Sequence, residues 1–301
     1  MFSLPIPILL VITVIASWLN SLICGYFPKR VSSDDGAIDL FNLFRNLFCA
    51  AAIATLLALS GALGSVSFFT ILLGVLMGLA NIFGALAHLK AFAIGPFSYT
   101  TVIVSLSAII PALSGLFFGE SISALQWVGV ALMALCLFLS PEKGEGEQKK
   151  ASVKWMILSL ISAALSGVTG IIQKVHQNSE HADEMGALLI STFAVSAVIS
   201  AVMLAFRKNK GQAESSGSVM HKPIFWILPI VGGCVFAFPH TINLFLSGKL
   251  DSVIFFPIVN LCPMLVSMLS GMIIFRERLS PRRWAGVAVG ILSTVLLAGI
   301  I

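Results

Sequence analysis

The sequence predicts an all-α integral membrane protein with ten transmembrane helices, arranged as two inverted five-helix repeats. Three observations support this fold class: an apolar composition, ten apolar runs, and a sequence match between the two halves of the chain. The 301 residues are 58% hydrophobic and only 10% charged, with a mean hydropathy of +1.01. Ordinary soluble domains carry about 25% charged residues. Since a soluble fold of this size could not bury so much apolar surface, we expect lipid around the protein.

Ten apolar runs follow one another along the chain, each of about the length that spans a bilayer as a helix. They cover approximately residues 5–27, 38–60, 66–89, 95–118, 124–140, 154–176, 185–206, 223–246, 252–274 and 283–301. Helices are expected because backbone groups in hydrocarbon must form their hydrogen bonds within their own segment. A polar connection at 141–154 divides the chain into two halves, residues 1–145 and 150–301, each with five helices.

The two halves share a sequence signature near their ends. The segment GESISALQWVGVALMALCLFLS at 119–140 aligns without gaps with RERLSPRRWAGVAVGILSTVLL at 276–297. The alignment pairs Glu120 with Glu277 and keeps a serine, a tryptophan and a Gly-Val-Ala triplet at equal spacing. Because each half has an odd number of helices, the second half must cross the membrane in the opposite sense. We therefore expect an inverted repeat with a binding site near the midplane between the halves.

Six of the ten expected helices carry polar residues at the three- and four-residue spacing of one helix face. They are the first, third and fourth helices and their counterparts in the second half, the sixth, eighth and ninth. In lipid such a face points into the bundle or toward a water-filled cavity. A single small polar residue more often serves helix packing, but six matched stripes predict a central cavity.

The candidate substrate-binding residues lie on these stripes or at their ends. They are Asn20, Asn81, His88, Tyr99, Gln173, Lys174, His240, Asn243 and Asn260. For the asparagines, cavity lining and interhelical hydrogen bonding are equally open. His88 and Lys174 could instead extend toward the headgroups, as long polar side chains near helix ends do. His240 directly follows Pro239, whose ring frees a backbone carbonyl in the middle of a helix.

The charges in the helices favour a substrate that is held by its carboxylate, such as an amino acid or an organic acid. All 13 acidic residues lie in connections or at helix ends, whereas the charged or titratable candidates within the cavity are basic. A histidine could carry a coupling proton near neutral pH. A cationic drug exporter, which would use a carboxylate within the membrane, is an alternative. No HExxH, GxSxG or CxxC pattern is present, so we expect no enzyme activity, metal site or cofactor.

The repeated motifs FFGESISALQWVG and IIFRERLSPRRWAG, together with LFRN early in the second helix and GPFS before the fourth, resemble the drug/metabolite transporter superfamily. Within it, the chain is similar to the ten-helix EamA-like branch over nearly its whole length. The resemblance implies a secondary transporter that moves a small metabolite across the cytoplasmic membrane by alternating access. It also matches Arg45 to the family's second-helix arginine, for which an anchor at the membrane surface is an equal explanation.

The superfamily also contains flippases of lipid-linked substrates, so that activity is a second alternative. A membrane receptor or a structural protein is the alternative outside transport. The expected partners are the bilayer and a small-molecule substrate, and the chain is expected as a monomer or a homodimer. Nucleic acid is not expected despite the net charge of +5, because the basic residues are spread over the connections.

Most of the 18 Lys and Arg residues lie in the odd-numbered connections. The positive-inside rule makes that face cytoplasmic and places both termini outside. The family resemblance implies the reverse, with both termini in the cytoplasm, so the orientation is open between the two.

The helix count predicts the relative topology whichever face is cytoplasmic. Arg276, Arg278, Arg282 and Arg283 should share a membrane face with the connection at 141–154, because four helices separate the two. A single cysteine in either connection should react with a membrane-impermeant maleimide from the same side. Reaction from opposite sides would contradict the ten-helix count.

Overall fold

The computed structural model describes residues 4–60, 66–139, 153–209, 219–276 and 281–297, and every regular element in these ranges is a helix. In chain order the elements are α1 (Ile6–Tyr26), η1 (Phe27–Val31), α2 (Asp35–Ser60), α3 (Phe68–Ile94), α4 (Phe97–Ser105), η2 (Leu106–Ala108), α5 (Ile109–Ser114), η3 (Gly115–Phe118), α6 (Ala124–Leu139), α7 (Val153–Gln177), η4 (Ala182–Glu184), α8 (Met185–Asn209), α10 (Pro223–Ser247), α11 (Ser252–Ile274) and α12 (Pro281–Leu297). Eight helical stretches within the described ranges are long and apolar enough to cross a membrane. The chain is therefore an all-α, multi-pass membrane protein.

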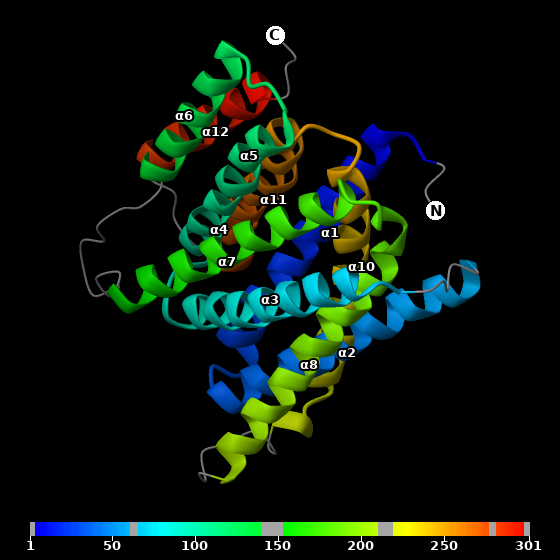
Figure 1. The fold of residues 1–301 in the computed structure, drawn as a ribbon. Helices are drawn as coiled ribbons and strands as arrows, with labels where there is room; N and C mark the ends of the chain where they lie inside the picture. The colour runs from blue at the N-terminus through cyan, green and yellow to red at the C-terminus, as the bar shows by residue number, and fades with distance from the viewer. Residues whose placement is uncertain (1–3, 61–65, 140–152, 210–218, 277–280, 298–301) are drawn as a thin grey trace.

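Helices α6 and α12 form the described parts of the fifth and tenth predicted segments, 124–140 and 283–301. They have 16 and 17 residues, whereas about 20 are needed to cross the hydrocarbon core without adjustment. The two helices lie side by side at the edge of the bundle (Figure 1), where Ser293 Oγ donates a hydrogen bond to the Gly129 carbonyl at 2.7 Å. The described chain thus has eight long helical stretches and a shorter apolar pair, and the expected ends at 140 and 298–301 fall outside it.

The fourth predicted helix is interrupted, so that α4 and α5 are joined by the 3₁₀ turn η2. Pro111 explains the position of the break. It has no N–H to donate to the carbonyl of Ser107, four residues earlier, and the backbone tightens to three residues per turn there. The break turns the hydroxyls of Ser105 and Ser107 toward α11, where both contact Asn260 at 3.5 Å.

The outward faces of the long helices are apolar. On α1 and α7, exposed side chains follow the spacing of a single helix face: Ile8, Val11, Ile15, Leu19, Met156, Ile157, Leu160 and Ile161. Soluble proteins rarely expose a contiguous apolar patch larger than a few hundred Å². Stripes of this kind on several helices are the lipid-facing surface of a membrane protein.

Glycines allow close helix contacts inside the bundle. A Cβ atom at Gly78 of α3 would lie 2.7 Å from the carbonyl oxygen of Thr192 on α8. Likewise, a Cβ atom at Gly233 of α10 would lie 2.6 Å from the carbonyl oxygen of Arg45 on α2. No larger residue fits at these distances, and small residues at such contacts are common between helices in lipid. The same two helices, α3 and α10, also pack against α7 and α1 respectively.

A buried ion pair joins the two halves of the chain. Lys174 at the end of α7 and Glu120 before α6 approach to 2.5 Å, and their side chains are 5% and 9% exposed. Lys174 Nζ also donates to the carbonyls of Ser247, the last residue of α10, and of Leu250, in the connection to α11. Glu120 accepts a hydrogen bond of 2.6 Å from the Ser252 N–H at the start of α11. Glu120, from the first half, is thereby fastened to three helix ends of the second half.

Breaking this pair should destabilise the protein. Glu120→Gln or Lys174→Met leaves one buried charge without its partner, at a cost of about 3–5 kcal/mol. Tryptophan fluorescence of the detergent-solubilised protein should show a clear fall in Tm for either variant. The double variant should regain part of the loss, because neither charge is then left alone.

The matched control is the pair Asp35–Lys90, whose side chains are 44% and 29% exposed. A solvent-exposed pair contributes about 0–1 kcal/mol, so Lys90→Gln should change the Tm little. Equal losses at the two sites would show that burial of the Glu120–Lys174 pair does not determine its contribution.

Candidate functional site

A polar cavity of about 250 Å³ lies between the helices, with residues of α1, α2, α3, the α4–α5 segment, α7, α10 and α11 around it. None of its described lining residues belongs to α6, α8 or α12. A cavity needs only about 10–15 Å³ of such space to hold one water. This one therefore has room for several waters or for a small metabolite.

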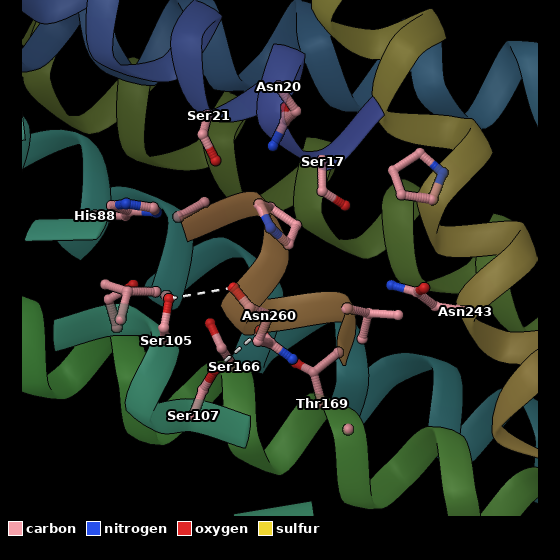
Figure 2. A pocket seen from close by; sticks show the side chains of 18 of the residues that line it. Ser17, Asn20, Ser21, His88, Ser105, Ser107, Ser166, Thr169, Asn243 and Asn260 are labelled. Atoms are coloured by element: carbon pink, nitrogen blue, oxygen red, sulfur yellow. Dashed lines mark hydrogen bonds between the residues drawn. The ribbon is translucent and has the colours of Figure 1, made fainter. Parts of the chain in front are cut away.

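The lining brings hydroxyls and amides from both halves of the chain to one place. Figure 2 shows Asn20 of α1, Asn243 of α10 and Asn260 of α11 around the same space, with Ser166 and Thr169 of α7 beside them. The six helices with polar stripes all contribute, and each does so through its polar face. The helical periodicity of the sequence therefore identified which faces meet.

Most of the predicted binding residues line this cavity: Asn20, Asn81, His88, Gln173, His240, Asn243 and Asn260. Tyr99 belongs to α4, but its side chain lies outside the part of the structure that is described. Lys174 does not line the cavity, although its neighbour Gln173 does, because one residue along a helix turns the side chain by about 100°. Its ammonium instead forms the ion pair with Glu120, a partner that no local pattern in the sequence indicates.

Two asparagines of the lining also donate hydrogen bonds to other groups of the protein. Asn81 Nδ2 donates to Ser196 Oγ of α8 at 3.0 Å, and Asn260 Nδ2 donates to the Phe256 carbonyl at 2.8 Å. The sequence left cavity lining and interhelical bonding open for these residues. Asn81 does both. Asn260 bonds within its own helix, and its Oδ1 lies 3.5 Å from the Ser107 hydroxyl.

Three of the predicted binding residues in the lining have polar atoms without a hydrogen-bond partner among the described residues. These atoms are His88 Nε2, His240 Nδ1 and Asn243 Oδ1. A buried polar atom left without a partner costs about 1–3 kcal/mol. The three residues line the cavity although these atoms are covered in the described conformation. A small movement of the side chains would let a ligand or water complete the hydrogen bonds, and a neutral imidazole can either donate or accept.

Arg45 of α2 also lines the cavity, although the second expected helix is not among the six with polar stripes. Its side chain is 2% exposed, which is inconsistent with an anchor among the headgroups. Its Nη1 donates to Cys24 Sγ at 2.9 Å, and its guanidinium carbon lies 4.6 Å from the ring centre of Phe236. Asn42, Arg45 and Asn46 have the i, i+3, i+4 spacing of one helix face, the signal in the sequence that indicates an inward stripe on this helix.

The charge of Arg45 has no counter-ion in the described structure. Two other buried charged groups are paired, Lys174 with Glu120 and Asp39 with Arg207. None of the described lining residues is acidic. The described residues also contain no group of three His, Cys, Asp or Glu side chains that could hold a metal ion. The described lining of the cavity is therefore polar and carries a positive charge.

No protein-family model matches the sequence, and no curated protein matches it. One similar solved structure, described only as the crystal structure of a protein, has a TM-score of 0.61 and 13% sequence identity to this chain. The similarity covers 96% of this chain and 99% of the other. At this identity the similarity shows only that the two proteins share a fold. The shared fold covers nearly the whole chain.

Replacing His240 or Asn243 by alanine should weaken ligand binding while leaving the fold nearly intact. Interhelical polar bonds in membranes contribute only about 0.6 kcal/mol on average. A lost hydrogen bond to a charged ligand group costs about 1.5–3 kcal/mol, which is roughly a ten- to hundredfold loss of affinity. Thermal-shift titrations with small carboxylic acids would measure it.

The control is Asn178→Ala. Asn178 is bonded to the Lys174 carbonyl at the end of α7 and lies outside the cavity lining. The Asn178→Ala variant should bind the acid with unchanged affinity. If His240→Ala and Asn243→Ala also leave the affinity unchanged, the cavity does not bind the acid.

Proposed function

We propose that this protein is a secondary transporter that moves a small metabolite, with amino acids and organic acids favoured, across the cytoplasmic membrane by alternating access. The observation that carries this proposal is the polar cavity between helices of both halves, inside a bundle of membrane-spanning helices. Polar side chains are costly in hydrocarbon and are typical of substrate pathways there. On the motifs that resemble it, we also assign the chain to the EamA-like branch of the drug/metabolite transporters.

The packing of the helices supports two related halves. If the first half corresponds in order to α7, α8, α10, α11 and α12, the contact of α3 with α7 matches that of α10 with α1. In the same way, the contact of α3 with α8 matches that of α10 with α2. The pairs α2–α8 and α6–α12 would then join corresponding helices across the two-fold axis. An inverted repeat of residues 1–145 and 150–301 would have this pattern, with the substrate between its halves.

The cavity is less suited to the other activities. A cationic drug exporter needs an acid at its site, whereas the described lining has a guanidinium and no carboxylate. A flippase of lipid-linked substrates needs a groove that is open sideways to lipid and large enough for a bulky headgroup. A receptor or structural protein needs no polar cavity between its halves.

Alternating access requires that one end of the cavity closes while the other opens. Gln173 of α7 and Phe256 of α11 line the cavity. Lys174, the residue after Gln173, and Ser252, one turn before Phe256, both contact Glu120. These contacts hold this end together in the conformation described. Transport would require them to separate.

A disulfide across this end should trap one conformation. A Cβ atom at Gly248, after α10, would lie 3.1 Å from the Cβ of Gln177 at the end of α7, near the 3.5–4.5 Å that a disulfide needs. The test variant carries Gln177→Cys and Gly248→Cys and keeps Cys24, which lines the cavity, as its only native cysteine. Once oxidised, it should expose Cys24 to a membrane-impermeant thiosulfonate only from the opposite side of the vesicle.

Before oxidation, and in each single-cysteine variant, Cys24 should react from both sides, because the site then faces each side in turn. Reduction should restore the two-sided labelling. Labelling from one fixed side in every sample would contradict alternating access and favour a receptor or structural protein.

A further inference from the structure

Arg45 has a full positive charge at any physiological pH, yet its side chain is 2% exposed. Removing a charge from water costs several kcal/mol unless an opposite charge or further hydrogen bonds compensate. The ring of Phe236 and the thiol of Cys24 offer only weak compensation. Among the described residues, no carboxylate lies within ion-pair distance of this guanidinium, although other buried charges are paired. Without a ligand, the buried charge of Arg45 is therefore not balanced by any described residue.

The atoms of Arg45 that lack a partner are Nε and Nη2. Together they form one edge of the guanidinium, and two parallel N–H donors of this kind match the two oxygens of a carboxylate. Lysine could not present this planar pair. The donor geometry and the missing counter-charge thus indicate the same kind of ligand group.

We propose that Arg45 is the anion-binding residue of the cavity and that the substrate is a monocarboxylate of net charge −1, such as a 2-hydroxy acid, rather than a zwitterionic amino acid. This inference rests on the proposed transport function and narrows its substrate class. The carboxylate lies against Nε and Nη2 of Arg45, which are covered by neighbouring side chains in the described conformation, so binding requires those side chains to move aside. The hydroxyl donates to a free acceptor of the lining, for which Asn243 Oδ1 is available.

The described lining contains no acidic residue, and this distinguishes the two substrate classes. An amino acid would bring an ammonium group beside its carboxylate, and no described lining residue offers a negative charge for it. Its positive charge would also be repelled by Arg45, since like charges a few ångströms apart interact strongly away from water. A hydroxyl at the same position needs only one hydrogen bond.

The test uses thermal-shift titration of the purified full-length protein with matched compounds that differ at one position. Lactate, alanine and lactamide form one set; phenyllactate, phenylalanine and phenyllactamide form a larger one. In the native protein, a hydroxy acid should bind at least tenfold more tightly than the amino acid of its set, and the neutral amide should not bind. Arg45→Gln should weaken binding of the hydroxy acid tenfold or more, and Arg45→Lys should retain part of it.

The matched control is Lys249→Gln, which removes one positive charge from an exposed residue outside the cavity lining and should leave every affinity unchanged. Tighter or equal binding of the amino acid or the amide by the native protein would overturn the inference, whether or not the Arg45 variants fold. Saturable uptake of an amino acid into proteoliposomes, undiminished in Arg45→Gln, would also overturn it and leave transport standing. Arg45-dependent binding of hydroxy acids without any uptake would overturn the transport function and uphold the anion site.

Discussion

Hydrocarbon offers no hydrogen bonds, and this constraint underlies each level of the structure. Backbone groups must be paired within helices, and polar side chains must find their partners inside the bundle. The apolar stripes on α1 and α7 and the hydroxyl of Ser196, bonded to the Gly78 carbonyl, are two results of it. Helices in lipid gain little from burying apolar surface, so close packing at positions such as Gly78 and Gly233 brings them together.

The same constraint explains where the helices are irregular. Proline inside a helix leaves a carbonyl without its donor, which is tolerated at membrane depth only where protein or a water-filled cavity surrounds it. Pro111, Pro239 and Pro263 are all lining residues of the cavity. The broken backbone and the polar side chains therefore gather in one region, as expected if this region is wet or holds a ligand.

Charge is distributed unevenly between the ends and the middle of the bundle. The pair Lys174–Glu120 lies at the end of the bundle where α8 begins, and Arg207 with Asp39 lies at the end where α8 finishes. These pairs are complete and fasten helices to one another. Arg45 lies between these pairs. Its side chain is buried, and its Nε and Nη2 have no partner among the described residues. The paired charges stabilise the conformation in which they meet. An unpaired charge in a cavity can instead be compensated by a ligand of opposite charge.

Composition and periodicity by themselves determined the all-α membrane class, the approximate position of each long helix and the polar faces that meet at the cavity. These features are local, because a helix shows its two faces in its own sequence. The tertiary structure decided what lies opposite each face. It paired Lys174 with Glu120, turned Arg45 into the cavity, broke the fourth helix beside α11 and set α6 against the short α12. The spacing of residues gives the direction of a side chain around its own helix, but the partner that it meets depends on how distant helices pack.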